Sequence, residues 1–534
     1  MKLIAFVSDE NYLALANVAA ELESLTSGDR HLLLSSARGA LYGDVPSGSY
    51  RVTLSKGGYG AKWVICRLET GTPYQFRLLS DCILGFMWPK WVRADEAAEI
   101  RCHSPEPYQL TLWRYGLKKE FVRMLGWYDE HGPRATVQIT PDGDYSQTGV
   151  NWNQCGYPVP HVQQSVRAPE RSGLYYLWAR TAAGRTFSFP WVVAPKTPRA
   201  RMAVLASTNT WNAYNNFGGR SNYINNGGLP PTPTVNARQD LTRYTSAQSA
   251  WSIADNEYKP LAFERPEPGN DIFDNPPWGE SAITDPIQGR MQCGQAPGEW
   301  RLLGWLEREG IAYDYYAEAQ LHDGTLPLEA YNVLVTSVHP EYWTREMFNR
   351  ADVWVREQAG RLIYLGGNGV NCEVLFEPGA TMRCLSFDDS GDSASGHDSR
   401  MHRTFKSEAT MLGVAFSESG VMTAAPYRTL AADHWVFAGT GLRTGDLFGE
   451  RSLHERVSGG ASGHETDKIT SSSPKLLDHL AKGVNPNNGG ADMVYFEQGA
   501  GAVFSVGSIT WVSSLFTDDR ISRITRNVIE RFLK

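Results

Sequence analysis

The sequence lacks long hydrophobic runs, closely paired cysteines and clusters of basic residues. No uninterrupted apolar stretch reaches the roughly 18 residues that a membrane-spanning helix needs, so no membrane partner is expected. The seven cysteines are irregularly spaced and include no Cys-x-x-Cys pair, which argues against a zinc knuckle or a disulfide framework. Reduced thiols are typical of a cytoplasmic protein, and we expect that location.

Basic residues are also fewer than acidic residues. The 534 residues carry 51 Lys and Arg against 58 Asp and Glu, a net charge of −7, and a nucleic-acid partner is therefore not expected. Three catalytic signatures are absent as well: the Gly-x-Ser-x-Gly nucleophile elbow, the His-Glu-x-x-His zinc motif and the dinucleotide-binding glycine fingerprint. Covalent and redox-cofactor catalysis are therefore less well supported than other chemistries.

The first part of the chain is predicted to be β-rich. Short alternating runs bounded by Gly, Pro and Asp predict strands over most of about the first 195 residues, with one helix expected near residues 12–23. Closely spaced strands with turn residues between them are typical of packed β-sandwiches. Pro190, Pro195 and Pro198 indicate a boundary after this part.

Strands then alternate with helices. A continuous apolar strand is predicted at residues 202–207, and further strands are predicted at 311–316, 333–337 and 361–365, with helices at 299–309 and from Thr344 to Gly360. This alternation predicts a parallel sheet covered by helices on both faces. A hairpin is expected at 492–506 and a closing helix at 521–533.

Chemically active side chains follow three of these strands. Ligands bind beyond the carboxyl ends of the strands in open α/β sheets, where this sequence places residues 208–223, 338–343 and 366–372. His339 and Glu341 are two residues apart, so the carboxylate could ligate a metal while the imidazole handles a proton. The simpler interpretation is a carboxylate that stabilises a helix start beside a loop histidine.

Two glycine-rich turns supply further groups. Residues 366–372 lack the Lys and Ser/Thr of a phosphate-binding loop, but Asn368 could donate an amide hydrogen bond to a developing oxyanion. Glu465, in residues 463–467, supplies a second carboxylate, although a solvated turn is the simpler interpretation. Carboxylate, imidazole, phenol and amide groups together favour metal-assisted hydrolysis.

Several segments, taken in order, resemble the large (β) subunit of N,N-dimethylformamidase and its relatives. They are residues 208–223, 337–343, 365–369, 433–442 and 463–467, within a likeness that extends from about residue 75 to the C-terminus. The resemblance implies an accessory β-rich module at residues 1–74 and a β-sandwich domain at 75–197. It further implies a glutamine-amidotransferase-like (flavodoxin-like) α/β domain at 198–534, with a long active-site loop at 209–298.

The resemblance also implies a mononuclear iron ion, in the Fe³⁺ state, held by two tyrosines and one glutamate. Glu341 matches the glutamate and Tyr214 the first tyrosine, while His339, Glu465 and Asn368 match the histidine, acid/base carboxylate and pocket amide. Tyr258 is the first choice for the second tyrosine. Tyr244 and Tyr223 are alternatives, and a register that aligns Phe263 instead would remove this ligand.

We therefore expect a hydrolase that cleaves the C–N bond of a small amide-like substrate through a metal-activated water. A carbohydrate-active hydrolase with Glu341 and Glu465 as paired carboxylates is one alternative, and a non-catalytic binding protein on the same scaffold is another. The resemblance implies a small partner subunit, and a homo-oligomer is the alternative assembly.

Overall fold

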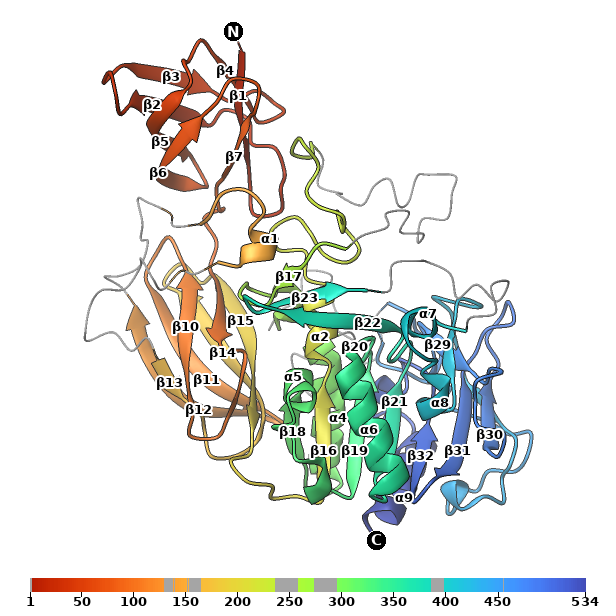
Figure 1. Cartoon of the computed structure of the whole chain (residues 1–534). Coiled ribbons are helices and arrows are strands. Elements are labelled where there is room, and N and C mark those ends of the chain that lie inside the picture. The colour runs from red at the N-terminus through yellow and green to blue at the C-terminus, as the bar shows by residue number, and fades with distance from the viewer. Residues whose placement is uncertain are drawn as a thin grey trace.

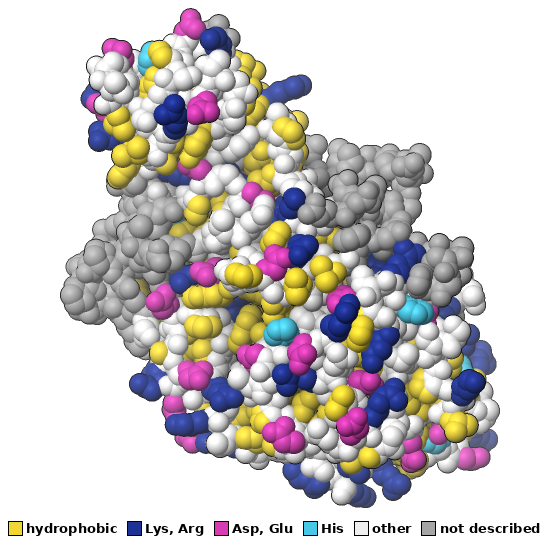
Figure 2. Space-filling model, in the orientation of Figure 1, with side chains coloured by type: hydrophobic (Ala, Val, Ile, Leu, Met, Phe, Trp, Pro, Cys, Tyr) yellow, Lys and Arg dark blue, Asp and Glu magenta, His cyan; other side chains and the backbone are white. Residues whose placement is uncertain are grey.

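The computed structural model describes residues 2–128, 138, 140–150, 152, 165–235, 258–272, 295–385, 398–454 and 456–534. These residues form a β-rich protein of several sheets with few helices (Figure 1). Acidic and basic side chains are interspersed over the face shown in Figure 2. Within these ranges, every helix is too short or too polar to cross a membrane.

Two sheets enclose a hydrophobic core at the N-terminus. The strand orders are β4-β1-β7 and β3-β2-β5-β6. The helix expected near residues 12–23 is wrong: residues 19–24 form a strand in which Ala20 and Leu22 are buried and Glu21 is exposed, which is the two-residue period of a strand. The strands are β1 Lys2–Ser8, β2 Ala19–Ser24, β3 Arg30–Leu34, β4 Ala40–Gly43, β5 Gly48–Lys56, β6 Gly60–Leu68 and β7 Tyr74–Arg77.

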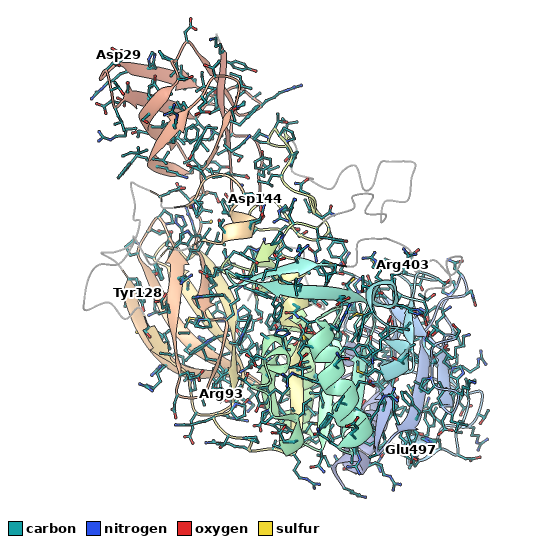
Figure 3. All side chains as sticks on the ribbon, in the orientation of Figure 1. Asp29, Arg93, Tyr128, Asp144, Arg403 and Glu497 are labelled. Atoms are coloured by element: carbon teal, nitrogen blue, oxygen red, sulfur yellow. The ribbon has the colours of Figure 1, made fainter. Side chains whose placement is uncertain are left out.

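A sandwich of two further sheets follows, with strand orders β13-β10-β8 and β12-β11-β14-β15-β9. Alternate residues of both sheets, such as Phe86, Ile100 and Leu177, share one core. Tyr128 marks the end of β12 in Figure 3. The elements are β8 Leu84–Trp88, β9 Trp91–Arg93, β10 Ala97–His103, β11 Tyr108–Tyr115, β12 Lys119–Tyr128, α1 Tyr145–Thr148, β13 Ser165–Arg167, β14 Gly173–Thr181 and β15 Thr186–Ala194.

The segment around α1 connects the N-terminal sheets to the rest of the chain. Asp144, labelled in Figure 3, caps α1 and forms an ion pair with Arg220 at 3.0 Å. Asp142 accepts from the buried Lys62 of β6 at 2.5 Å. Lys62 and Arg220 therefore each have a carboxylate partner, which offsets the cost of removing their charges from water. The predicted domain boundaries stay predictions.

A nine-stranded sheet forms the C-terminal part, in the order β18-β16-β19-β21-β32-β31-β30-β26-β27. The first five strands are parallel, as the alternation of strands and helices predicts, but β31, β30, β26 and β27 continue it antiparallel. The sheet is therefore mixed. Its strands are β16 Met202–Ala206, β18 Asp314–Ala317, β19 Val333–Val338, β21 Arg361–Gly366, β26 Tyr427–Thr429, β27 Leu447–Phe448, β30 Asp478–Gly483, β31 Asp492–Gln498 and β32 Gly501–Ser505.

Helices cover both faces of this sheet (Figure 1). α4 (Gln295–Arg308) and α9 (Asp519–Leu533) pack with Val335 and Ile363 on one face. α5 (Glu318–His322) and α6 (Arg345–Glu357) pack with Leu334 and Leu362 on the other face. Neighbouring residues of each strand thus enter opposite cores, which explains the continuous apolar runs in the sequence.

Shorter elements surround the carboxyl ends of the parallel strands. α2 (Thr208–Ala213) follows β16, and a small sheet has the order β17-β23-β22-β20. The remaining elements are β17 Leu261–Ala262, β20 Tyr342–Trp343, β22 Cys372–Glu377, β23 Thr381–Cys384, α7 Arg400–Thr404, α8 Ala409–Leu412, β24 Ala415–Ser417, β25 Ala424–Ala425, β28 Ser462–Gly463 and β29 Thr466–Lys468. Within the expected loop 209–298, residues 236–257 and 273–294 lie outside the described part.

Glu299 of α4 anchors the start of α2. Its Oε1 accepts from the backbone N–H of Ser207 at 3.1 Å and from Trp211 Nε1 at 3.0 Å. Its Oε2 accepts from the Tyr315 hydroxyl at 2.8 Å. Burial raises the pKa of Glu299 to about 7, although these hydrogen bonds oppose the shift.

This raised pKa predicts a pH dependence of stability. The native state holds a proton on Glu299 that the unfolded chain releases above its ordinary pKa of 4.5, so this group's stabilisation is lost as the pH rises through about 7. The free energy of unfolding is expected to fall by about 3 kcal/mol over this pH range. We expect Glu299→Gln to flatten the dependence, because its oxygen can keep the two N–H donors while its amide donates to Tyr315.

The measurement is thermal unfolding between about pH 5 and about pH 8. Glu329→Gln, at an exposed glutamate, is the matched control and should leave the wild-type slope unchanged. If Glu299→Gln unfolds with the same pH dependence as the wild type, the buried carboxyl does not have the role described.

Candidate functional site

Three neighbouring parallel strands deliver side chains to one cavity of about 730 Å³. Tyr214 follows β16 at the end of α2, His339 and Glu341 follow β19, and Asn368 follows β21. Because the carboxyl ends of parallel strands meet at one edge of the sheet, residues far apart in sequence become neighbours here. Glu465, between β28 and β29, completes the set.

Glu341 is the centre of a cluster of oxygen atoms. Its Oε2 accepts from the hydroxyls of Tyr214 and Tyr223, each at 3.0 Å, and Tyr223 lies equally close to Oε1. The Tyr342 hydroxyl, which is not part of the cavity lining, donates to the Tyr223 hydroxyl at 2.9 Å. The Glu341 backbone N–H donates to Thr210 Oγ1 at 3.0 Å. Two phenols thus meet one carboxylate in a buried place.

The loops that present these groups have unusual backbone conformations. Val338, Asn368, Val370 and His464 have φ of +60°, +51°, +55° and +66°. Such values are uncommon for residues other than glycine, and most costly for the β-branched valines. Strained residues of this kind persist where surrounding contacts hold them, and they cluster at functional sites. Val338 directly precedes His339, His464 directly precedes Glu465, and Asn368 is itself a residue of the site.

His339 lies between two carboxylates. Its Nε2 is 3.2 Å from Glu341 Oε2 and 3.1 Å from Glu465 Oε2. Burial alone would lower the His339 pKa, but the two carboxylates outweigh it and raise the pKa to about 10. Burial conversely opposes ionisation of Glu465, yet His339 and Asn368 bring its pKa down to about 2. The imidazole therefore holds a proton at neutral pH, and Glu465 stays ionised.

Asn368 positions Glu465. Its Nδ2 donates to Glu465 Oε2 at 2.8 Å, and its backbone N–H donates to Asp467 Oδ1 at 2.7 Å. Asp467 also accepts from the Tyr364 hydroxyl at 2.7 Å. One of the two amide hydrogens of Asn368 is thus used on Glu465, which leaves the other for a ligand.

The oxygen cluster has the chemistry of a site for a hard metal ion. Burial, followed by the Glu341 charge, raises the pKa of Tyr214 and of Tyr223 well above the ordinary value, so both phenols keep their protons when only protein surrounds them. A trivalent cation favours anionic oxygen ligands and would take the place of those protons. Two phenols that each lie 3.0 Å from one carboxylate therefore fit such an ion.

The structure brings five of the six predicted site residues together: Tyr214, Glu341, His339, Asn368 and Glu465 all line the cavity. Tyr258 lies instead in a hydrophobic cluster with Phe263 and Cys384, outside the cavity lining. Tyr223, an alternative in the sequence analysis, is the second tyrosine that contacts Glu341. Tyr244, the other alternative, lies outside the described residues.

Sequence reasoning missed two groups on the cavity wall, Arg400 and His464. Neither residue stands in a motif whose spacing indicates a ligand, and Arg400 follows segment 386–397, so only the folded chain places it near the strand ends. His464 directly precedes Glu465. Its positive φ of +66° belongs to the turn that places the Glu465 carboxylate at the cavity.

A buried set of acid, base and phenol groups in a cavity at strand ends defines an enzyme-type site. The chain belongs to the family described as N,N-dimethylformamidase beta subunit-like, C-terminal, whose model matches residues 119–522.

Two curated relatives, from Paracoccus aminophilus and an Alcaligenes species, are both named N,N-dimethylformamidase beta subunit. They are 29% and 28% identical to this chain over 297 residues. The match covers 46% of this chain and 38% of each relative, so well under two thirds of their length is matched. Among solved structures, the major pilin subunit BcpA of Bacillus cereus covers 39% of this chain and 72% of its own, at 11% identity and a TM-score of 0.15, which supports no conclusion.

Proposed function

We propose that this protein hydrolyses the C–N bond of an amide-like small molecule in the cavity at the strand ends. The observation that carries the proposal is the convergence of Tyr214, Tyr223 and Glu341, with His339 linking Glu341 to Glu465. The names of the two relatives support the reaction class. Family membership supports the same class, because the family model covers the segments that supply these residues.

Tyr214, Tyr223 and Glu341 would hold an iron ion, as the donor set favours. Bound there, iron would supply a Lewis acid and make water nucleophilic near neutral pH. Tyr342 keeps the Tyr223 hydroxyl in place at 2.9 Å, and Thr210 fixes the Glu341 backbone. Neighbouring residues thus orient two of the three oxygen donors, Tyr223 and Glu341.

His339, Glu465 and Asn368 would transfer the proton and bind the substrate carbonyl group. His339 carries a proton on a nitrogen that faces Glu341 and Glu465, so it can donate to the departing amine nitrogen. Glu465 keeps that imidazole protonated until the nitrogen leaves. The remaining amide hydrogen of Asn368 can donate to the substrate carbonyl oxygen, where negative charge develops.

The placement of His339 bears on the carbohydrate alternative. A glycosidase needs open space between its two carboxyl groups for the glycosidic oxygen and a water or sugar carbon. Here an imidazole occupies the space between Glu341 and Glu465. The geometry therefore favours the amide over the glycoside.

The parallel half of the nine-stranded sheet, with helices on both faces, supports the proposal that this part is a glutamine-amidotransferase-like domain. The relatives are named beta subunits, and we include a small partner subunit in the proposal. A cytoplasmic location is likewise proposed.

The test is amine release from a panel of short aliphatic amides, with elemental analysis of the same purified protein. We expect about one iron per chain and release of amine from at least one amide. The matched measurement uses nitrophenyl glycosides, from which no nitrophenol should appear. Glycoside cleavage, or a metal-replete protein inert towards the whole panel, would contradict the proposal.

A further inference from the structure

Arg400, the first residue of α7, lies on the wall of the same cavity and has no role in the proposed hydrolysis. Arg403, labelled in Figure 3, marks this helix. The Arg400 Nη1 lies 3.8 Å from the thiol sulfur of Cys372, and the same sulfur lies 3.7 Å from Glu341 Oε1. One thiol therefore separates the guanidinium from the oxygen cluster.

Arg400 differs from the other enclosed cations in its partners. Among the ion pairs between described residues, none within 4.0 Å involves Arg400. Arg265 and Arg77 also have no carboxylate partner within the described ranges, but both donate to several backbone carbonyls instead. The paired cations include Lys62 with Asp142, Lys90 with Glu267, Arg101 with Glu264, Arg114 with Glu307 and Arg220 with Asp144.

The acidic residues beside Arg400 already have partners. Glu341 accepts from Tyr214 and Tyr223 and lies beside His339, and Glu465 is held by His339 and Asn368. Neither carboxylate approaches the guanidinium as an ion pair. The half-buried Arg400 guanidinium, without a carboxylate partner among the described residues, offers a planar array of donors to the cavity. That array matches a carboxylate in two-point contact.

We propose that Arg400 is an anion subsite and that the substrate is an amide carrying a carboxylate a few bonds from the scissile bond, such as a short N-acyl amino acid. This inference rests on the proposed function for the position of the amide. The cavity volume of about 730 Å³ lies in the range of about 300–1,000 Å³ typical of drug-sized ligands. It accommodates a substrate that reaches from Glu341 to Arg400.

The experiment compares two probes of similar length on the full chain, N-acetyl-β-alanine and the uncharged N-butylacetamide. Titration calorimetry gives the affinities, and amine release is measured in the same samples. We expect the wild type to bind the anionic probe about 10- to 100-fold more tightly. Arg400→Met should remove that preference and leave the affinity for N-butylacetamide within about threefold.

Arg456 provides the matched control, since it is an exposed arginine on the same cavity wall. Arg456→Met should keep the preference, and Arg400→Lys should retain part of it, because lysine keeps the charge but loses the two-point contact. Should Arg400→Met fail to fold, the affinities of the wild type and of Arg400→Lys for the two probes still test whether Arg400 binds the carboxylate.

The outcomes separate the subsite from the reaction. Preferential binding of N-acetyl-β-alanine without amine release supports the subsite and counts against hydrolysis of such amides. Amine release from both probes at equal affinity overturns the subsite and supports the hydrolase. Equal or absent binding of the anionic probe by the wild type, or a preference lost in Arg456→Met but kept in Arg400→Met, also overturns it.

Discussion

Replacement of Glu341 by alanine is expected to abolish both metal binding and amide hydrolysis. Glu341 supplies the carboxylate that meets Tyr214 and Tyr223 at 3.0 Å and lies 3.2 Å from His339. Its loss removes an anionic donor and leaves two phenols that burial keeps protonated. We expect the rate of hydrolysis to fall at least about 10³-fold, since the Lewis acid contributes several kcal/mol.

Elemental analysis and amine release on the purified variant check this result. Glu373→Ala is the matched control, because Glu373 is also a buried glutamate near the cavity but pairs with Arg345 on α6. It should lower stability and leave the metal content unchanged. A Glu341→Ala protein that keeps both its iron and its activity would refute the assignment.

Tyr223→Phe is expected to lower the iron content and the activity by about 10- to 100-fold or more, whereas Tyr258→Phe should change neither. Tyr258 is buried and Tyr223 is half-buried, and burial raises the pKa of both phenols, so the two substitutions remove the same group from similar surroundings. Of these two tyrosines, Tyr223 donates a hydrogen bond to Glu341, and no such bond joins Tyr258 to Glu341 in the described part of the chain. The pair therefore distinguishes the tyrosine that the structure places at Glu341 from the one that the sequence favoured.

Visible absorption provides a second measurement. Iron bound to ionised tyrosine gives a charge-transfer band, and the band should be lost or shifted in Tyr223→Phe and unchanged in Tyr258→Phe. The opposite pattern, with the band lost only in Tyr258→Phe, would mean that Tyr258 is the ligand in the metal-bound protein.

Local patterns predicted the parallel strands well. The strands predicted at residues 202–207, 333–337 and 361–365 correspond to β16, β19 and β21, which are mostly apolar because helices cover the sheet on both faces. Thr344 was expected to begin a helix, and its hydroxyl caps α6 by accepting from Met347. The hairpin of β31 and β32 and the helix α9 were also predicted.

The N-terminal error has a local cause. Residues 12–23 contain apolar residues at spacings that suit a helix, but Tyr12 and Asn17 have positive φ, which breaks helical continuity. Residues 19–24 then pair with β3 and β5 on either side. Pairing with distant strands outweighed the weak local preference, as is usual for β-structure.

The sequence by itself determined which segments form the central strands and which chemical groups follow their carboxyl ends, because burial on both faces and strand termination leave local signatures. Tertiary structure alone decided that Tyr223 rather than Tyr258 meets Glu341, and that Arg400 faces the cavity without a described carboxylate partner. These contacts join residues more than a hundred positions apart or close a loop around the strand ends. Such distances depend on how the whole chain packs, and no short-range pattern encodes them.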